Sequence, residues 1–584
     1  MKVHIDFEGQ HKYFCDPIKI LATANVSSIK KCVEEIESFI AQGFYAVGYL
    51  AYESAMGFNQ ANQTQSNPPQ DTDLPLLLFG IFDKYTSHSP TSIPHYQAEP
   101  LELSCDTTIE EYNQKIDFIH SQIELGNTYQ TNYTIQFKAP FDGNPIDYYY
   151  FLQKNNQADY CAYLEHDDYH ILSISPELFF RIENKTITTK PMKGTIGRGL
   201  TTQQDNQQRI LLMSEKNLAE NMMIVDLLRN DLSQISKPGT VVVPKLFSAE
   251  KYPTVWQLTS TIEGQLIEDI HLFDIFRALF PCGSITGAPK VSTMQIITQI
   301  ENTARGVYCG TIGYIEPFGH KMIFNVPIRT LTINQQYMHY GVGGGITWDS
   351  TSQDEYNEIL IKSAILNRTI TIPEYIIESL LLEKGQFFLL DQHLTRLADS
   401  ASYFNFECNI HIIKLTLINL AKNYSENVYK IRILLRENGH FEINHDSIIA
   451  PMQIAEIAFA PNCVNNQNLF LYHKTSIRHH FPALPPAKEY INFNQHDEIT
   501  EFVNGNIALL VDNQWVTPKI TSGLLAGTMR QFYLESKQLI EKTLTKKELL
   551  HAEKIAFINS VRKWVEIDDK VFNQFKQQLI NATI

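Results

Sequence analysis

Two charged residues in the first third of the chain have a spacing that acid–base or nucleophilic chemistry could use. Glu177 precedes the apolar run LFFRI, and Lys193 follows the run KTITT, with a turn signal at Glu183-Asn184 between the runs. Such runs predict a β-hairpin, which can bring the carboxylate and the ammonium to the same end of a sheet. One group could transfer a proton, and the other could act as a nucleophile if burial lowers its pKa. An ordinary surface pair is the alternative.

A second set of charges falls on two predicted helices. Glu220 lies within SEKNLAENMMIVDLLRND, and QDEYNEILIK places Glu355, Glu358 and Lys362 three and four residues apart, on one helix face. Two carboxylates from separate helices suit Mg²⁺ when substrate oxygens and water fill its other positions. A solvated charged face would have the same spacing.

The glycine-rich segment GVGGGITWD, Gly341–Asp349, is a candidate anion-binding turn. Its glycines fit neither G-x-G-x-x-G nor the phosphate-binding pattern G-x-x-x-x-G-K-[ST]. Glycines after a strand still allow backbone N–H groups to approach a carboxylate closely. A tight turn without a ligand is equally compatible with this spacing.

These residues depend for their positions on the elements around them. Apolar spacing predicts helices over Glu111–Glu124, Ser214–Ile235 and Glu355–Ile370. In the second of these helices the spacing places Leu218, Met222, Val225 and Leu228 on one inward face. The polar stretch Gly57–Pro75 predicts a solvated loop. Pro373 ends the last helix and marks a domain boundary, so we expect domains over 1–372 and 373–584.

Several segments of the first domain resemble one family in sequence and in order. They are SPELFF, PMKGTIGRG, AENMMIVDLLRND, PCGSITGAPK, GVYCGTIGYI, GVGGGI and EYNEILIK, and the resemblance to the chorismate-utilising enzymes covers about residues 40–370. It implies an α+β fold in which a large antiparallel β-sandwich is wrapped by helices. Mg²⁺ and chorismate would bind between the sheets.

The resemblance also assigns roles by position. Glu220 and Glu358 resemble the Mg²⁺ ligands, and Glu177 resembles the general acid/base at the ring. The positions that resemble substrate contacts are Gly194, Thr195, Tyr308, Arg329, Gly343, Gly345 and Lys362. Among them, Arg329 and Lys362 would pair with the two carboxylates of chorismate.

Lys193 discriminates within the family. In P-x-K-G-T it resembles the lysine of aminodeoxychorismate synthases, whereas anthranilate synthases usually have alanine there. The implied chemistry is addition of the Lys193 amine at C2 with loss of the 4-hydroxyl, followed by entry of ammonia at C4 and expulsion of the lysine. One departure is Gln257, which stands where the family usually has histidine. Glutamine can form hydrogen bonds but cannot carry charge.

The second domain contains a lysine, Lys474, that the sequence places directly after an apolar strand, LFLY. A lysine at a strand end that faces a cleft is what a Schiff base with pyridoxal phosphate requires, and a surface lysine is the alternative. The hairpin turn Asn438-Gly439 and a helix over Asp391–Phe404 belong to the same predicted α/β unit.

The surroundings of Lys474 resemble the fold-type IV pyridoxal-phosphate enzymes over about residues 374–584. LLDQHLTRL resembles the segment whose arginine, here Arg396, binds the cofactor phosphate, and Glu501 resembles the carboxylate that pairs with the pyridine nitrogen. Gly527 and Thr528 open a predicted helix whose N–H groups can hold phosphate.

Within that family, the K-x-x-x-R spacing of Lys474 and Arg478 resembles 4-amino-4-deoxychorismate lyase more than the transaminases. The implied step is removal of the C4 proton by Lys474 and loss of pyruvate, which makes the ring aromatic. The chain would then produce 4-aminobenzoate for folate synthesis. The alternatives are an anthranilate, isochorismate or salicylate-type synthase, a branched-chain or D-amino acid transaminase, and a non-catalytic second domain.

Composition limits the partners and the compartment. The net charge of −16 disfavours nucleic acid and anionic membranes. None of the eight cysteines are spaced as C-x-x-C, and the N-terminus has no apolar signal core, so we expect a cytoplasmic enzyme. No G-x-C-x-G nucleophile segment occurs, so ammonia would come from a separate glutamine amidotransferase subunit. Fold-type IV relatives suggest a homodimer through the second domain.

Overall fold

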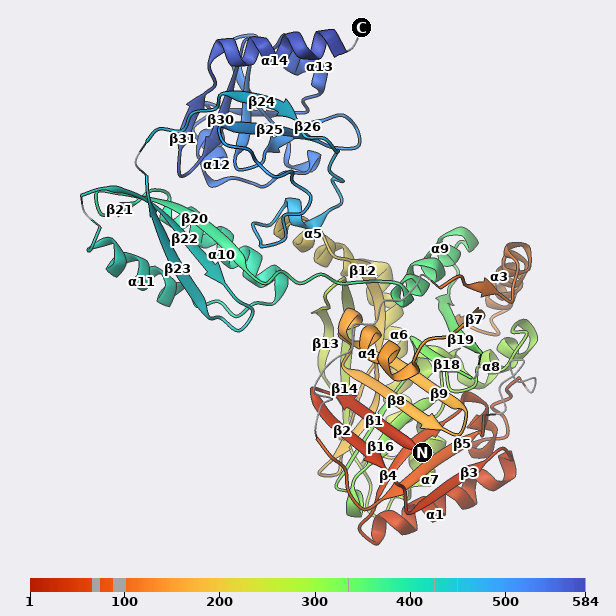
Figure 1. Cartoon of the computed structure of the whole chain (residues 1–584). Helices are drawn as coiled ribbons and strands as arrows, with labels where there is room; N and C mark the ends of the chain where they lie inside the picture. Colours follow the sequence, from red (N-terminus) through yellow and green to blue (C-terminus); the bar gives the residue numbers. More distant parts are fainter. Residues whose placement is uncertain (66–73, 88–100, 335, 425, 449, 583–584) are drawn as a thin grey trace. The chain divides into compact units, whose positions relative to one another are not determined.

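The computed structural model describes residues 1–584 apart from 66–73, 88–100, 335, 425, 449 and 583–584 (Figure 1). The chain divides into two compact units. The first consists of Met1–Gly197 and Arg209–Ile370, and the second of Arg198–Gln208 and Thr371–Ile584. Each unit has its own buried hydrophobic clusters, as independently packed domains do.

A nine-stranded antiparallel sheet forms one layer of the first unit. Its strand order is β15-β7-β19-β18-β9-β8-β1-β2, and β6 pairs with β7. The strands are β1 (Lys2–Phe7), β2 (Gln10–Cys15), β6 (Ser104–Cys105), β7 (Gln130–Pro140), β8 (Tyr160–His166), β9 (Tyr169–Ser175), β15 (Gly287–Ala288), β18 (Thr330–Ile333) and β19 (Tyr337–Ile346).

A ten-stranded antiparallel sheet forms the other layer. Its order is β12-β14-β11-β10-β17-β16-β4-β5-β3, and β13 pairs with β14. The strands are β3 (Lys19–Thr23), β4 (Tyr45–Leu50), β5 (Leu77–Phe82), β10 (Leu178–Glu183), β11 (Thr186–Lys190), β12 (Met192–Gly197), β13 (Val242–Lys251), β14 (Val255–Gln265), β16 (Thr311–Ile315) and β17 (Lys321–Asn325).

The two sheets pack face to face around a shared core. Val3 and Ile5 of β1 belong to the same buried cluster as Val47 and Tyr49 of β4. Because side chains alternate between the faces of a strand, the opposite faces need their own cover. Helices supply it: α1, α6 and α7 pack on the ten-stranded sheet, and α3, α4, α8 and α9 on the nine-stranded sheet.

The helices of this unit are short to medium in length. They are α1 (Ile29–Ala41), α2 (Ala55–Phe58), α3 (Ile109–Glu124), α4 (Pro145–Asn156), α6 (Glu215–Ser233), α7 (Leu272–Leu279), α8 (Lys290–Ile300) and α9 (Ser352–Ser363), with 3₁₀ turns at Val26–Ser28, Tyr52–Ser54, Gly283–Ile285, Pro317–Gly319 and Ala364–Leu366. This sandwich wrapped by helices is the fold that the sequence predicts for the first domain.

The second unit contains two sheets. A four-stranded sheet has the order β21-β20-β22-β23, and an eight-stranded sheet runs β24-β25-β26-β27-β28-β29, with β30 paired to β27 and β31. The strands are β20 (Ile376–Glu383), β21 (Gln386–Phe387), β22 (Val428–Leu435), β23 (Phe441–Ser447), β24 (Glu456–Phe459), β25 (Lys488–Phe493), β26 (Ile499–Phe502), β27 (Asn506–Val511), β28 (Gln514–Pro518), β29 (Ile540–Lys542), β30 (Lys554–Asn559) and β31 (Lys563–Glu566).

The helices of the second unit are α10 (Leu390–Phe404), α11 (Ile410–Ala421), α12 (Thr528–Glu535), α13 (Lys546–His551) and α14 (Asp569–Ala582), with 3₁₀ turns at Leu469–Leu471 and Ile520–Ser522.

The segment Arg198–Gln208 belongs to the second unit although it directly follows β12. It includes the first part of α5 (Thr202–Leu212). The Arg198 guanidinium lies 4.3 Å from the ring centroid of Tyr403, and the Tyr403 hydroxyl donates to the carbonyl of Gly199 at 2.8 Å. Leu200 packs against the cluster of Val464, Leu471 and Tyr472. The pattern of the sequence alone does not predict this division of the chain.

The helices and strands confirm some of the local predictions and correct others. The hairpin at Glu183-Asn184 is confirmed as β10 paired with β11, and Ser214 is the N-cap of α6. Met222 is 38 % exposed, so the predicted apolar face of α6 is wrong at that residue. The helix predicted over Glu355–Ile370 begins earlier and ends earlier, because α9 spans Ser352–Ser363. Of the predicted polar loop, 66–73 lie outside the described residues.

The strand predicted before Lys474 is also wrong. Leu469–Leu471 form a 3₁₀ turn, because the Asn468 side chain accepts a hydrogen bond from the N–H of Phe470 and starts the turn. Lys474 nevertheless adjoins a sheet, since its carbonyl accepts from the N–H of Ile377 at 2.8 Å.

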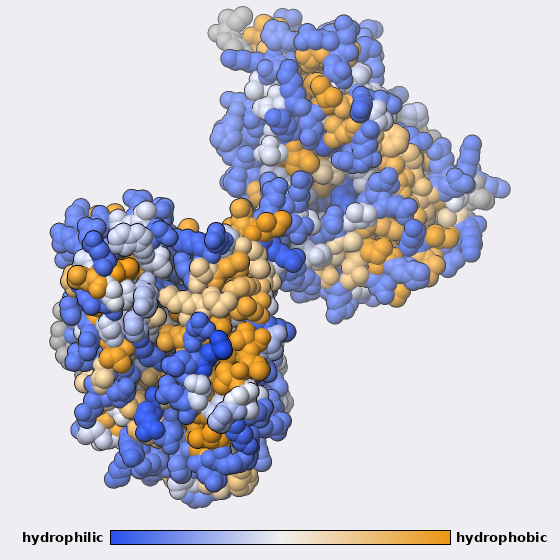
Figure 2. Space-filling model, turned by 180° about the vertical axis from the view of Figure 1, so that it is seen from behind, coloured by the Kyte–Doolittle hydropathy of each residue, from blue (hydrophilic) through white to orange (hydrophobic). Residues whose placement is uncertain are grey.

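The face of the molecule drawn in Figure 2 is largely hydrophilic, with apolar residues gathered in smaller areas. Among the described residues, no helix is both long enough and apolar enough to span a bilayer.

Candidate active sites of the two units

A cavity of about 250 Å³ in the first unit collects every site residue predicted for that half of the chain. The strands and loops of the two sheets, together with α6 and α9, supply its walls. The predicted residues that line it are Glu177, Lys193, Gly194, Thr195, Glu220, Tyr308, Arg329, Gly343, Gly345, Glu358 and Lys362.

Glu177 and Lys193 meet in this cavity in the manner that the hairpin predicts. Glu177 is 3 % exposed, and burial raises its pKa to about 7 although Ser284 and Lys193 oppose the shift. Its Oε1 atom has no hydrogen-bond partner among the described residues. Burial lowers the pKa of Lys193, with Glu220 acting in the opposite direction. A carboxyl that holds its proton near neutral pH therefore lies beside an amine that loses its proton more readily than usual.

The glycines of β19 make room for this pair. A Cβ atom at Gly345 would lie 2.7 Å from Lys193 Nζ and 1.9 Å from Gln130 Nε2. A Cβ at Gly343 would lie 2.1 Å from the carbonyl oxygen of Tyr133 on the neighbouring strand. The glycine run therefore permits a close approach of backbone to side chain, which spacing alone leaves undecided.

Glutamic acid side chains from α6 and α9 face the same cavity. Burial raises the pKa of Glu220, and the charge of Glu358 adds to this shift. Lys362 lowers the pKa of Glu358, and their side chains form an ion pair at 2.7 Å. Lys362 Nζ also donates to the carbonyl of Gly343 at 2.7 Å. To bind both a metal and a substrate carboxylate, Glu358 and Lys362 would have to separate.

These carboxylates fit Mg²⁺ as hard oxygen ligands from two helices. In the described part of the chain, no three His, Cys, Asp or Glu side chains are grouped closely enough to hold a metal ion by themselves. Substrate oxygens and water would therefore have to complete the coordination of an ion held by Glu220 and Glu358. Glu355, which accepts from Ser350 Oγ at 2.7 Å, lines the same wall.

Arg329 and Gln257 both line this cavity but differ in their contacts. Within the described ranges, no hydrogen bond or ion pair engages the Arg329 guanidinium, so its donors remain available to an anion. Gln257 on β14 holds the neighbouring strand β12: its Nε2 donates to the Gly194 carbonyl at 3.0 Å, and its Oε1 accepts from Thr195 Oγ1 at 2.9 Å. The residue that replaces the family histidine thus fixes two of the predicted contact residues without carrying charge.

A second cavity, of about 330 Å³, lies in the second unit. All the cofactor-binding residues predicted for this half line it: Arg396, Lys474, Glu501, Gly527 and Thr528. Burial lowers the pKa of Lys474 to about 8, and Arg396 adds to that shift. A lysine with this pKa supplies the neutral amine that attacks an aldehyde more readily than an ordinary lysine does.

Glu501 and the start of α12 occupy two other walls of this cavity. Glu501 is 5 % exposed, and burial raises its pKa to about 8 despite a hydrogen bond from the N–H of Leu525. A cationic ring nitrogen would compensate such a carboxylate. Gly527 is the N-cap of α12, and a Cβ there would lie 2.0 Å from Asn506 Oδ1. The donor set therefore fits pyridoxal phosphate: an amine, a buried carboxyl, an arginine and a helix N-terminus.

Comparison with known proteins assigns the first unit to a family. Residues 6–368 match the family model described as chorismate binding enzyme. The chain belongs to the chorismate-binding enzymes. Residues 375–569 match a second model, described as amino-transferase class IV.

Two relatives of this chorismate-binding enzyme carry the name aminodeoxychorismate synthase component 1. The protein from Salmonella typhimurium is 43% identical over 253 residues, which cover 43% of this chain and 56% of that protein. The protein from Escherichia coli is 36% identical over 342 residues, which cover 54% of this chain and 75% of that protein. The chain thus spans little more than half the length of the Salmonella relative.

A solved structure supports the fold of the chorismate-binding half. Anthranilate synthase component I from Streptococcus pneumoniae superimposes with a TM-score of 0.52 at 24% identity, and covers 63% of this chain and 90% of that chain. At this identity the likeness concerns the fold.

Sequence reasoning missed residues in both cavities of this chorismate-binding enzyme. Lys216 and Ser284 line the first cavity, and Glu489 lines the second. Glu489 is 3 % exposed with one oxygen unpartnered among the described residues, and burial raises its pKa to about 7. Ser284 lies within the family-like segment PCGSITGAPK, so the sequence could have indicated it as a site residue. Lys216 and Glu489 lie in no such segment that singles them out, and each looks like an ordinary charged residue.

Proposed function

We propose that the first unit converts chorismate and ammonia to 4-amino-4-deoxychorismate. The observation that carries the proposal is Lys193, an amine with a lowered pKa. It shares a cavity with Glu177, a carboxyl whose pKa is raised to about 7, and with the carboxylates Glu220 and Glu358. The relatives named aminodeoxychorismate synthase component 1 support the same reaction.

The residues can be given roles in this reaction. The neutral Lys193 amine adds at C2 of the ring, the double bond shifts, and the C4 hydroxyl leaves as water with the proton of Glu177. Ammonia then adds at C4, the double bond returns, and the C2–N bond to Lys193 breaks. Arg329 would hold one substrate carboxylate, and Lys362 the other after leaving Glu358. Mg²⁺, held by Glu220 and Glu358, would neutralise charge on the bound substrate.

The contact residues complete the site. Gly194 and Thr195 present backbone and hydroxyl groups on the strand β12, which Gln257 holds, and Gly343 and Gly345 let the β19 backbone approach the ligand. Tyr308, 7 % exposed, lines the cavity. The ammonia would come from a separate glutamine amidotransferase subunit, as the name component 1 of the relatives suggests.

For the second unit, we propose elimination of pyruvate from 4-amino-4-deoxychorismate to give 4-aminobenzoate, a folate precursor. Lys474 would take the C4 proton, the C3–O bond would break, and pyruvate would leave as the ring becomes aromatic. Arg396, Gly527 and Thr528 would hold the phosphate of pyridoxal phosphate, and Glu501 its ring nitrogen. When bound, that cofactor supplies an electron sink for the pair released at C4. A homodimer through this unit is part of the same proposal.

A single assay tests both halves. Purified chain is mixed with chorismate, Mg²⁺, pyridoxal phosphate and ammonium at mildly alkaline pH, and the products are separated by chromatography. We expect 4-aminobenzoate and an equal amount of pyruvate. Anthranilate or salicylate would overturn the role of Lys193, and 4-amino-4-deoxychorismate alone would overturn the role of the second unit.

A further inference from the structure

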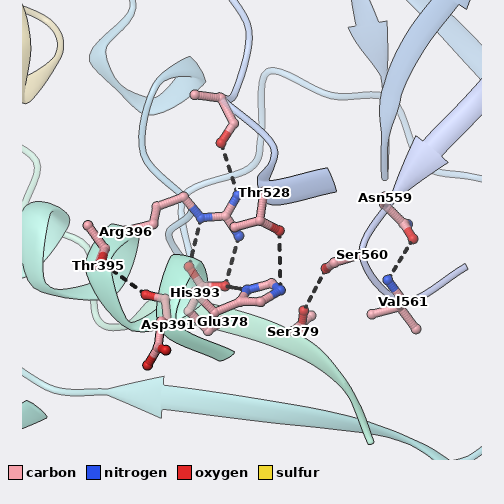
Figure 3. A network of polar contacts seen from close by, with 11 residues as sticks. Glu378, Ser379, Asp391, His393, Thr395, Arg396, Thr528, Asn559, Ser560 and Val561 are labelled. Carbon is pink, nitrogen blue, oxygen red and sulfur yellow. Dashed lines mark hydrogen bonds and ion pairs between the residues drawn. The ribbon is translucent and has the colours of Figure 1, made fainter. Parts of the chain in front are cut away.

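A buried carboxylate that the proposed reaction does not use lies beside the second cavity. Glu378 on β20 is 1 % exposed at its side chain, and it faces His393 and Arg396 on α10 (Figure 3). Figure 3 also shows Thr528, the first residue of α12, on the far side of His393. Burying a charged carboxylate is costly unless its oxygens are fully paired, so the pairing of Glu378 needs a reason.

One edge of the Arg396 guanidinium is taken up by Glu378. Nε donates to Oε1 at 2.8 Å, and Nη2 donates to Oε2 at 2.8 Å. Nη1 donates to the carbonyl of Ala526 at 3.2 Å, just before the start of α12. A guanidinium carries five N–H groups, so one remains on Nη1 and one on Nη2. The Arg396 guanidinium, a planar fork of N–H donors, lines the cavity, so these two N–H groups can bind an oxyanion there.

The second oxygen of Glu378 orients His393. His393 Nδ1 lies 2.7 Å from Glu378 Oε2, and Nε2 lies 3.2 Å from Thr528 Oγ1. Burial lowers the pKa of His393, so the ring is neutral and carries one proton. That proton belongs on Nδ1, because Nδ1 faces a carboxylate that can only accept. Nε2 is then an acceptor, and the Thr528 hydroxyl donates to it.

The contacts of Glu378 therefore reach two parts of the cavity wall at once. Direct hydrogen bonds fix the plane of the Arg396 guanidinium, and the His393 ring fixes the Thr528 side chain at the N-terminus of α12. The backbone N–H groups at a helix N-terminus favour an anion, and they act together with a guanidinium only if both point to the same place. Glu378 is hydrogen-bonded to Arg396 directly and linked to Thr528 through His393, so this one carboxylate can hold both groups in that orientation.

We propose that Glu378 is a positioning residue for a phosphate monoester, holding the Arg396 fork and the start of α12 in one fixed arrangement. The inference rests on the function proposed for the second unit, and it deepens that function by naming what organises the phosphate end of the cavity. Glu378 does not contact the ligand itself, since both of its oxygens are occupied by His393 and Arg396.

The test compares two ligands that differ only in the phosphate. Pyridoxal phosphate and pyridoxal offer the same aldehyde to Lys474, and both can be titrated by absorbance with the full chain. In Glu378→Gln we expect affinity for pyridoxal phosphate to fall about 10- to 100-fold, because charge-assisted hydrogen bonds hold the fork. Affinity for pyridoxal should change less than about twofold.

Glu489→Gln is the matched control, because it removes another buried carboxyl from the same cavity wall without any contact to Arg396 or His393. It should leave the ratio of the two affinities unchanged. An unchanged ratio in Glu378→Gln, or an equal loss for both ligands, would overturn the inference while leaving the proposed function intact. Failure of the unaltered chain to bind pyridoxal phosphate would overturn both.

A less disruptive variant tests the same inference if Glu378→Gln fails to fold. Thr528→Val removes only the hydroxyl that donates to His393 and keeps the volume of the side chain. We expect a loss of about 3- to 10-fold for pyridoxal phosphate, the worth of one hydrogen bond, and none for pyridoxal. Equal affinities for the phosphate ester in this variant and in the unaltered chain would count against the relay through His393.

Discussion

At the scale of single residues, the reaction proposed for the first unit depends on an amine and a carboxyl whose pKa values are shifted toward each other. Burial is the first cause of both shifts, lowering the pKa of Lys193 and raising that of Glu177. Such a pair suits a step that needs a nucleophile and an acid in one cavity. Neither shift can be inferred from spacing, because it depends on how completely the sandwich encloses the hairpin.

Lys193→Ala removes the amine that the proposal uses as a nucleophile. We expect 4-amino-4-deoxychorismate formation to fall at least about a thousandfold, since losing a covalent route worth ~4 kcal/mol of barrier has that effect. Product formation is followed by chromatography. The same variant, supplied with 4-amino-4-deoxychorismate, should still release pyruvate at the normal rate. A retained synthase rate would exclude the covalent role of Lys193.

Glu177→Gln tests the buried carboxyl through stability as well as rate. Burial raises the pKa of Glu177 to about 7 in the folded chain from an ordinary value of 4.5, so the folded state binds this proton more tightly than the unfolded state does. The free energy of unfolding should therefore fall as pH rises from 4.5 to 7. The variant, which cannot ionise, should therefore be more stable than the unaltered chain at pH 8, by about 3 kcal/mol at most, and about equal at pH 4.5. Thermal unfolding at the two pH values measures this. A stability difference that does not change with pH would contradict the raised pKa.

At the scale of elements, β19 and β12 place the reacting groups. Gly345→Ala on β19 would put a methyl group 1.9 Å from Gln130 Nε2 and 2.7 Å from Lys193 Nζ, so the ends of both flexible side chains must move. Since a misplacement of about 1 Å can cost 10²-fold in rate, we expect the synthase rate to fall about 10- to 100-fold with little change in melting temperature.

Gly197→Ala is the matched control for this strand geometry. Gly197 ends β12, the strand that carries Lys193, and a Cβ there meets no atom within 4 Å. Its synthase rate, measured in the same chromatographic assay, should stay within about twofold of the unaltered chain. Equal losses in both variants would mean that glycine matters here for backbone flexibility and not for space.

Much of both sites was predictable, because catalytic motifs name residues directly. All sixteen predicted positions line one of the two cavities, although their roles remain proposals. What sequence could not indicate depends on long-range packing. Glu378 is one of two glutamates in the otherwise mostly apolar strand IIESLLLE, and only its partners on α10 indicate what it does. The apolar run before Lys474 predicts a strand, but the structure has a 3₁₀ turn there, because the Asn468 side chain caps that turn.

At the scale of the whole molecule, the sequence of the first half contributes a segment to the second unit. Asp205 Oδ1 accepts from Arg198 Nε at 2.6 Å and from the N–H of Gly199 at 3.0 Å, and both side chains of this ion pair are buried. Asp205→Ala removes this carboxylate partner of the buried Arg198, whose Nη2 keeps its hydrogen bond to the Tyr403 carbonyl at 3.3 Å, so we expect a loss of stability of about 1–3 kcal/mol. We expect weaker binding of pyridoxal phosphate by the variant, measured by absorbance titration. A loss confined to the synthase reaction would contradict the assignment of 198–208 to the second unit.

The two proposed reactions share an intermediate, so they can be tested with two variants that each lack one of the two activities. Lys474→Ala should consume chorismate and accumulate 4-amino-4-deoxychorismate, because its synthase cavity is intact. Lys193→Ala should form nothing from chorismate, yet it keeps the second cavity. Mixing the two variants should restore 4-aminobenzoate formation, with a lag that shortens as protein concentration rises, because the intermediate must diffuse between chains. In the unaltered chain both sites act at a high effective concentration of each other, so the lag should be shorter. A mixture that accumulates 4-amino-4-deoxychorismate without forming 4-aminobenzoate would mean that the second unit does not act on this intermediate, whatever its fold.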